Sequence, residues 1–170
     1  QALATVTERL KADGDRIRLI QGNFANLGKL AADNGFLSPN GVLLDLGLSS
    51  LQLETPERGF SFLREGRLDM RFDMNQEMSA FEVANKQTEE ELAVTIYKFG
   101  EEPAARRVAK AIVNARPIQT TSELARVVSK ATGRRSRGRT HPATRTFQAL
   151  RIVVNQELDN LQQGIKQGID

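Results

Sequence analysis

The 170-residue sequence contains no cysteine, and it has no apolar run that approaches the length of a membrane-spanning helix. The missing thiol excludes a disulfide framework, a thiolate metal site and a cysteine nucleophile within this stretch. A membrane span would need roughly 18 consecutive apolar residues, and a secretory signal would need a charged segment followed by an apolar one. We therefore expect a protein of the reducing cytoplasm with no membrane contact.

The composition is that of a folded globular protein. Hydrophobic residues make up 39% of the sequence and charged residues 26%. These fractions are ordinary for soluble domains and far from the low hydrophobicity of disordered chains. The length suits one domain, or one domain with an inserted subdomain.

Positive charge is unevenly distributed along the chain. Residues 101–151 contain 12 Lys and Arg against 3 Asp and Glu, a net charge of +9, which leaves −6 for the rest of the chain. A basic region of this kind is typical of a surface that meets a polyanion. Charge alone leaves open the alternative of a well-solvated helical surface.

The first part of the sequence alternates between helix and strand patterns. Residues 2–11 and 24–32 have helical patterns, whereas residues 16–21 and 41–45 have the patterns of strands. This order is typical of a doubly wound α/β sheet. Residues 46–74 are rich in Gly, Ser, Asp and Arg without a sustained period, which predicts a long ordered loop.

The remaining sequence is predicted to be helical. Thr88 with Glu91, and Thr120 with Glu123, match the capping-box pattern, so a helix is expected to begin directly after each threonine. A further helix is predicted over residues 102–115.

The last predicted helix follows His141 and Pro142, because proline suits the first helical turn. Apolar residues then recur at spacings of three and four, which predicts one long helix with one buried stripe. The stripe consists of Phe147, Leu150, Val154, Leu158, Leu161 and Ile165.

Asp45 closes the expected strand at residues 41–45 and opens a Gly/Ser segment. In open α/β sheets, ligands bind beyond the carboxyl ends of the strands, where such an acidic residue would point into the crevice. The alternative is that its carboxylate only caps a turn.

Two phenylalanines, Phe60 and Phe62, flank a serine in the expected loop. They could form a stacking platform for a base, or they could anchor the loop to the core. Asp69 and Arg71 could form an ion pair that fixes the loop without taking part in chemistry.

An arginine cluster lies within the basic region. Guanidinium groups suit phosphate geometry, so the cluster could follow a nucleic-acid backbone. His141 could contact the same substrate, although its simpler role is to cap the helix that Pro142 starts, and we assign it no metal. The candidate substrate-binding arginines are Arg134, Arg135, Arg137, Arg139 and Arg145.

Four segments, DLGLSSLQL, RGFSF, LDMRFD and HPATRTFQALRIVVNQEL, resemble in order the signature segments of the MraW/RsmH family. Members of this family methylate cytosine in small-subunit ribosomal RNA. QGNFANL and FGEEPAARRVAKAIV also resemble family segments, so the resemblance covers nearly the whole chain. Two positions depart from the pattern: Arg67 stands where the family usually has proline, and Phe72 replaces a common methionine.

The resemblance implies an α/β fold that is mostly helical overall: a partial class I, Rossmann-like methyltransferase sheet with an inserted all-helical domain. It implies a partial methyltransferase domain over residues 1–75, an RNA-recognition insertion over 76–145 and a long returning helix over 146–170. The glycine-rich cofactor loop and the ribose-binding acid would precede Gln1, and the closing strands would follow Asp170.

The implied activity is S-adenosylmethionine-dependent methylation of the exocyclic N4 amine of a cytosine in 16S ribosomal RNA, with the RNA or the ribosomal particle as partner. On this resemblance, Phe24 would lie against the adenosine of the cofactor, Asp45 at the strand end would contact the cofactor near the transferring methyl group, and Gln52 would complete the same wall. Phe60 or Phe62 would support an unstacked base. The missing cysteine favours nitrogen as the acceptor, because methylation of the ring carbon usually proceeds through a cysteine adduct.

Two other functions stay open. The basic region would also suit a noncatalytic RNA-binding helical module, and a related methyltransferase could act on DNA. If the chain carries only the middle of a methyltransferase, we expect it to bind the cofactor weakly or not at all and to associate through exposed sheet edges.

Overall fold

The computed structural model describes residues 2–133 and 140–169. The chain divides into two compact units. One comprises Gln1–Leu44 and Leu158–Asp170 and is called the terminal unit; the other, Asp45–Glu157, is called the helical unit. These units differ from the three predicted segments, because residues 45–75 pack with the helices that follow them. The division into catalytic and RNA-recognition domains stays a prediction.

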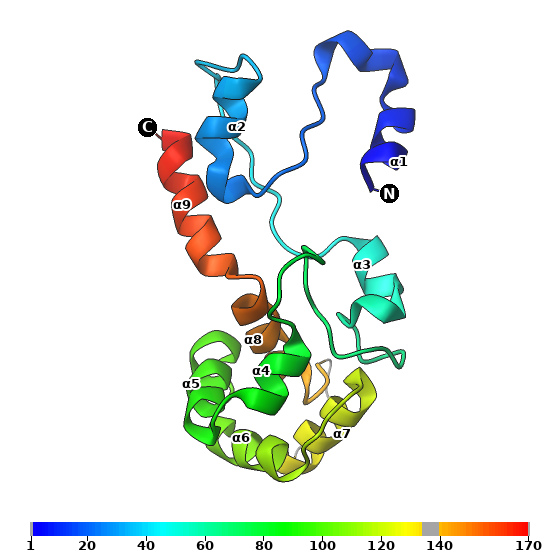
Figure 1. The fold of residues 1–170 in the computed structure, drawn as a ribbon, viewed down its shortest axis with the longest axis vertical. Coiled ribbons are helices and arrows are strands. Elements are labelled where there is room, and N and C mark those ends of the chain that lie inside the picture. The colour runs from blue at the N-terminus through cyan, green and yellow to red at the C-terminus, as the bar shows by residue number, and fades with distance from the viewer. Residues whose placement is uncertain (1, 134–139, 170) are drawn as a thin grey trace. The chain divides into compact units, whose positions relative to one another are not determined.

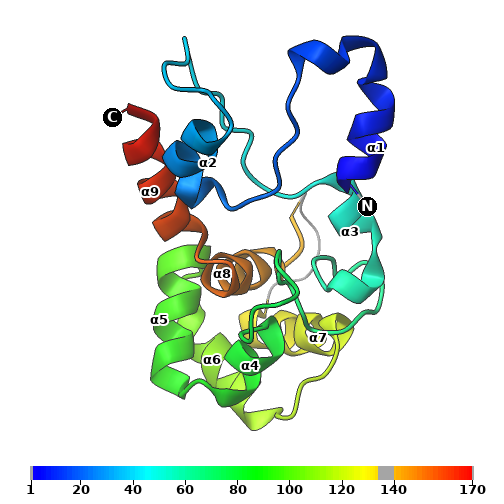
Figure 2. The ribbon, with the colours of Figure 1, turned by 45° about the horizontal axis from the view of Figure 1, so that its top comes forward.

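The helical unit is built around a group of packed helices (Figures 1 and 2). In it, α5 packs against both α6 and α8, α6 packs against α7, and α4 contacts α6 and α8. These helices are α4 (Ala80–Lys86), α5 (Glu89–Gly100), α6 (Ala105–Asn114), α7 (Thr121–Thr132) and α8 (Thr144–Val154).

The two predicted capping boxes are confirmed. The hydroxyls of Thr88 and Thr120 accept hydrogen bonds from the backbone N–H groups three residues on, and the glutamate side chains at those positions accept from the threonine N–H groups. These contacts satisfy N–H groups that a helix start otherwise leaves unpaired. A third capping box joins Ser79 to Glu82 at the start of α4.

The core of the helical unit combines helix faces with loop side chains. Within the predicted long loop, the chain forms two short helices, α3 (Ser50–Glu54) and η3 (Pro56–Arg58). Loop residues also enter the core, so this segment is held in place by apolar burial. The largest fully buried apolar side chains are Leu68, Met70, Leu92, Ile96, Ile112, Ile118, Leu124, Leu150, Val83, Val108 and Val128.

The prediction of one long C-terminal helix is wrong. Helix α8 ends at Val154 and α9 (Glu157–Ile169) begins after a break in which Gln156 has a φ of 48°. Because a left-handed residue does not continue a right-handed helix, the apolar spacing does not run through one helix. Phe147, Leu150 and Val154 are buried, whereas Leu158 and Ile165 are 50% and 45% exposed.

The terminal unit contains α1 (Ala2–Arg9), η1 (Lys11–Arg16), η2 (Phe24–Asn26), α2 (Leu27–Asp33) and nearly all of α9. The helices predicted near its start are confirmed. Residues 17–21 and 41–45 are irregular, and the described part of the chain contains no strand, only one isolated bridge between Arg67 and Thr120. The predicted sheet is therefore not confirmed, because a strand forms only where a neighbouring strand pairs with its N–H and C=O groups. The mostly helical character is confirmed.

Among residues 2–133 and 140–169, no helix is both long enough and apolar enough to cross a membrane.

Candidate functional site

Segments from three parts of the sequence line one pocket of about 520 Å³ in the helical unit. This volume lies within the usual range for small-molecule sites. The wall is mainly apolar, with a few polar side chains. The lining residues are Leu48, Leu53, Phe60, Ser61, Phe62, Leu63, Met70, Thr140, His141, Thr144, Phe147, Gln148 and Arg151.

The loop that carries the two phenylalanines depends on Gly59. Its φ is 70°, and a Cβ atom added there would lie 2.2 Å from the carbonyl oxygen of Arg67. Only glycine allows both this conformation and this close approach of two backbone segments. The turn directs Phe60 into the core, where its ring is 6% exposed and stacks on Phe72 at 5.4 Å between centroids. Phe60 therefore anchors the loop.

Phe62 is the phenylalanine that remains partly exposed in the pocket wall. Its ring lies 4.5 Å from the ring of His141 and meets Phe147 edge-on at 4.9 Å, measured between centroids. Aromatic contacts of this geometry fix ring orientation beyond what apolar burial alone provides. The structure thus brings Phe62 and His141 together, although 79 positions separate them in the sequence.

His141 fixes the turn before α8 and does not cap the helix in the predicted way, because the N-cap of α8 is Ala143 and no side chain caps it. Its Nδ1 accepts a hydrogen bond from the backbone N–H of Ala143 at 3.1 Å, and its carbonyl oxygen accepts from Thr144 at 3.0 Å. Because Nδ1 acts as the acceptor, the neutral ring carries its proton on Nε2. His141 therefore offers one N–H donor to whatever occupies the pocket.

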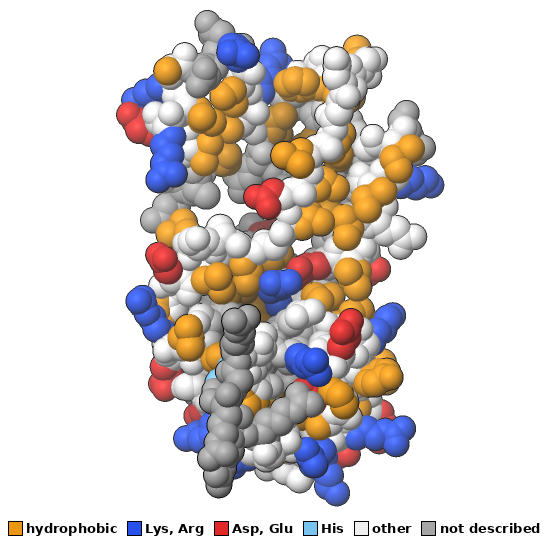
Figure 3. Space-filling model, turned by 180° about the vertical axis from the view of Figure 1, so that it is seen from behind, with side chains coloured by type: hydrophobic (Ala, Val, Ile, Leu, Met, Phe, Trp, Pro, Cys, Tyr) orange, Lys and Arg blue, Asp and Glu red, His pale blue; other side chains and the backbone are white. Residues whose placement is uncertain are grey.

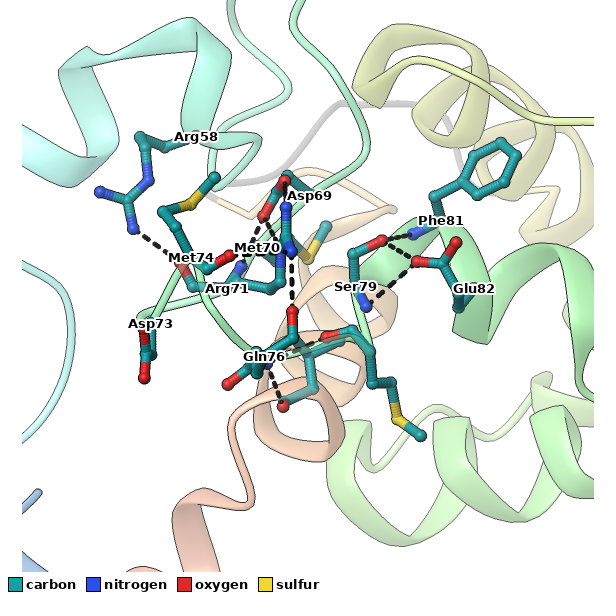
Figure 4. Close-up of polar contacts among 12 residues, drawn as sticks. Arg58, Asp69, Met70, Arg71, Asp73, Met74, Gln76, Ser79, Phe81 and Glu82 are labelled. Carbon is teal, nitrogen blue, oxygen red and sulfur yellow. Dashed lines mark hydrogen bonds and ion pairs between the residues drawn. The ribbon is translucent and has the colours of Figure 1, made fainter.

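An ion pair supports the loop behind this wall (Figure 4). The guanidinium of Arg71 donates to both carboxylate oxygens of Asp69, at 3.0 Å and 2.8 Å, and also to the carbonyl oxygen of Gln76. Burial would raise the pKa of Asp69, but the hydrogen bonds and charge of Arg71, with the charge of Arg58, outweigh it and hold this pKa below its usual value. The pair fixes the loop, which is the role expected if it takes no part in chemistry.

Asn155 is a supporting residue that the sequence patterns did not single out. It follows the last residue of α8, is 7% exposed, and its side chain donates to the carbonyl oxygen of Met70 and accepts from the N–H of Phe72. Its carboxamide holds the loop at residues 70–72 against the end of α8. A buried asparagine between two helical segments gives no periodic signal from which this role could be found.

Asp45 begins the helical unit in an irregular segment, and its side chain is exposed. Leu48, three residues further on, already lines the pocket. Gln52 lies in α3, where its Oε1 accepts a hydrogen bond from the backbone N–H of Ser49 in a capping box. The segment of residues 45–53 therefore contributes to the pocket through its leucines and uses Gln52 to start a helix.

Phe24 belongs to the terminal unit and packs against α9. A Cβ atom added to Gly164 would lie 2.8 Å from the ring of Phe24, so the small residue makes room for the ring. The side chain of Gln167 joins the same two segments, because it donates to the carbonyl oxygen of Ala25 and accepts from the N–H of Gly28. Phe24 is therefore held by a defined local packing arrangement.

Of the predicted RNA-binding arginines, the structure describes only Arg145. Arg145 donates to the carbonyl oxygen of Glu101 at 3.0 Å, which satisfies a backbone acceptor just after the end of α5. Its contact with RNA stays a prediction. The cluster Arg134, Arg135, Arg137 and Arg139 lies outside the described residues. Within the described ranges, no cluster of three or more His, Asp or Glu side chains could hold a metal ion.

Comparison with known proteins gives consistent results. Over 167 residues, the chain is 50% identical to a ribosomal RNA small subunit methyltransferase H of Dehalococcoides mccartyi, an alignment that covers 98% of this chain and 48% of that protein. Proteins of the same name from Coprothermobacter proteolyticus and Persephonella marina are each 47% identical, over 95% and 99% of this chain and 54% and 59% of their own lengths. The chain thus spans about half the length of the curated relatives it matches.

The model of the MraW methylase family matches residues 1–170, the full length of the sequence. The segments on which the resemblance rests include those that meet around the pocket. The chain therefore belongs to the MraW methylase family.

Proposed function

We propose that this chain forms the central part of an S-adenosylmethionine-dependent enzyme that methylates the N4 amine of a cytosine in small-subunit ribosomal RNA. One observation carries the proposal: the four signature segments, three within residues 45–73 and one that begins at His141, all contribute lining residues to a single pocket of the size of a small-molecule site. The names of the relatives support ribosomal RNA as the substrate class.

The pocket suits an unstacked pyrimidine. Because Phe60 is buried in the core, Phe62 is the aromatic ring that would contact the base. The Nε2–H of His141 can donate to a ring nitrogen or to the carbonyl oxygen of cytosine, both of which are acceptors. A nucleotide that reacts at its base must leave the stack to reach such a pocket.

Three residues of this chain have side chains of a kind that can contact S-adenosylmethionine: Phe24, Asp45 and Gln52. The exposed carboxylate of Asp45 can accept hydrogen bonds from an ammonium or hydroxyl group. The contact of Phe24 with an adenine rests on the resemblance, and the half-buried aromatic ring is of a suitable kind. Gln52 would face a ligand with its amide NH₂ group, because its Oε1 already accepts from Ser49. When bound, S-adenosylmethionine supplies an electrophilic methyl group.

Methyl transfer to this amine depends mainly on how the protein positions the cytosine relative to the methyl donor. The lone pair of the cytosine amine is delocalised into the ring, so the protein must orient the amine, and holding reactants in line lowers the barrier substantially. We assign this role to Asp45 from the resemblance, because Asp45 does not itself line the pocket and lies three residues before Leu48, which does. Its carboxylate would accept a hydrogen bond from the amine and leave the nitrogen facing the methyl donor.

Methyl transfer to small-subunit particles tests the proposal, using the chain extended at both ends to the length of its relatives. Asp45→Ala should reduce transfer by about 100-fold or more while RNA affinity stays within about 2-fold, since the oxygen that accepts from the amine is lost but the binding surface is not. Glu77→Ala is the matched control, because Glu77 is an exposed acid of the same unit. If the extended protein binds RNA but transfers no methyl group, the noncatalytic RNA-binding module is correct. If it methylates duplex DNA instead, the DNA enzyme is correct.

A further inference from the structure

A second pocket, of about 720 Å³, lies beside α5 and α6 and shares no lining residue with the first. We call it the α5–α6 groove. It is formed by Ala93, Val94, Tyr97, Pro103, Ala104, Ala105, Arg106, Arg107 and Thr132. The proposed chemistry uses none of these side chains.

Apolar and aromatic side chains are exposed on one wall of this groove. Tyr97, the one tyrosine of the sequence, is 67% exposed, and Val94, one turn before it on α5, is 62% exposed. Folding does not bury either side chain, so packing within the unit does not account for an aromatic ring at this position. An exposed tyrosine ring with its hydroxyl in water is suited to stacking contacts.

The other wall is cationic. Val108 and Ile112 turn the apolar face of α6 into the core, which leaves Arg106 and Lys110 exposed on the outer face, one turn apart. The guanidinium of Arg107 donates to the carbonyl oxygen of Thr132 at 2.9 Å, which fixes its orientation at the groove. Helix α6 contains no acidic residue.

The charges nearby favour a phosphate-bearing ligand over an acid-rich or apolar one. Within the groove, the lining residues include two arginines and no acid. Glu101 is exposed at the end of α5 but does not line the groove. Figure 3 shows Lys and Arg side chains interspersed with Asp and Glu side chains over the drawn face, so the cationic character belongs to the lining of the groove and not to the whole helical unit.

We propose that the α5–α6 groove is a binding site for an unpaired nucleotide of the RNA, with its base stacked on Tyr97 and its phosphate on Arg106. The proposal rests on RNA as the substrate. Aromatic rings combined with a cationic groove are the usual means of binding single strands without reading their sequence. The site would hold a nucleotide other than the one that is methylated, because the reaction pocket is lined by different residues.

Equilibrium binding to short single-stranded RNA from the small subunit, measured by fluorescence anisotropy at several salt concentrations, tests this site in the extended protein. Tyr97→Ala should weaken binding about 10-fold and Tyr97→Phe should leave it nearly unchanged, because stacking survives in phenylalanine. Arg106→Gln should lower the slope of log affinity against log salt by about 1. Arg126→Gln, which removes an exposed arginine of α7, is the matched control and should leave affinity within about 2-fold of wild type.

The proposal is overturned if Tyr97→Ala binds as tightly as wild type, if Arg126→Gln weakens binding as much as Arg106→Gln, or if duplex RNA of the same sequence binds more tightly than the single strand. Circular dichroism of each variant separates lost binding from lost folding, and crosslinking of RNA to a photoreactive residue at position 97 reports on the site directly. Failure here with methyl transfer intact rejects the groove alone. Absence of transfer by the wild-type extended protein rejects the proposed function.

Discussion

The side chain of Asn155 accepts a hydrogen bond from the backbone N–H of Phe72 at 2.6 Å, across 83 positions of sequence. The same side chain donates to the carbonyl oxygen of Met70 at 2.8 Å. Met70 has a φ of 63°, unusual for a residue with a side chain, and its side chain is 1% exposed. Asn155 thus stabilises a strained turn directly behind the pocket.

Replacing Asn155 by Ala should lower the free energy of unfolding by about 2 kcal/mol, because a buried carbonyl group at Met70 and a partly buried N–H group at Phe72 lose their partner. Chemical denaturation measures this change. Asn114→Ala, at the exposed end of α6, is the control and should change stability by less than about 0.5 kcal/mol. Equal stabilities for the two variants would contradict the role of Asn155.

The ion pair of Asp69 and Arg71 should make stability depend on pH in the acid range. The folded pKa of Asp69 is lowered, so its contribution is complete above the unfolded value of about 4 and is lost as the pH falls through the folded pKa. Asp69→Asn should be less stable at neutral pH by about 2 kcal/mol and should lose less stability on acidification. Thermal melts recorded between neutral and acid pH test this prediction, with Glu77→Gln as control. If the stability of Asp69→Asn and of wild type falls in parallel as the pH is lowered, the prediction is wrong.

The turn at Gly59 should not tolerate a side chain. Gly59→Ala would place a methyl group against the carbonyl oxygen of Arg67 in a left-handed conformation, so we expect a loss of at least about 2 kcal/mol in unfolding free energy. In Gly41→Ala the added Cβ has nothing within 4 Å, so this control should be nearly neutral. An unchanged melting temperature in Gly59→Ala would refute the account of the loop.

The 170-residue chain should associate in solution. Leu37 and Leu43 are 80% and 94% exposed, and Leu63 is 85% exposed. Because exposed apolar surface drives association, light scattering should show species larger than a monomer at high concentration. We expect association to occur mainly through the terminal unit, which carries two of these leucines. The double variant Leu37→Ser/Leu43→Ser should therefore associate less than the single variant Leu63→Ser. A stable monomer at high concentration would disprove the expectation.

Local signals predicted the helical unit well. Capping boxes at Thr88 and Thr120 depend on residues three apart, so the sequence contains all the information needed to place those helix starts. The break before α9 could not be predicted, because Asn155 and Gln156 interrupt neither the apolar spacing nor the helical composition. The contacts that fix the break lie in the loop at residues 70–72, far away in sequence.

The candidate site was predicted in part. Phe62 and His141 were both singled out as substrate-binding residues, but only the folded chain shows that their rings meet. The prediction gave Phe60 and Phe62 the same two possible roles, but Phe60 is buried and Phe62 is partly exposed in the pocket wall. The sequence could not separate them, because the direction of each ring depends on the turn at Gly59. The strands could not be confirmed, because pairing depends on neighbours that a local pattern does not specify.

Mass spectrometry of nucleosides from small-subunit ribosomal RNA, after reaction with the extended protein and labelled S-adenosylmethionine, tests the central claim most directly. The account predicts labelled N4-methylcytidine with wild-type protein and its near absence with Asp45→Ala. Label on the ring carbon of cytosine, label on another base, or equal N4-methylcytidine from both proteins would contradict it.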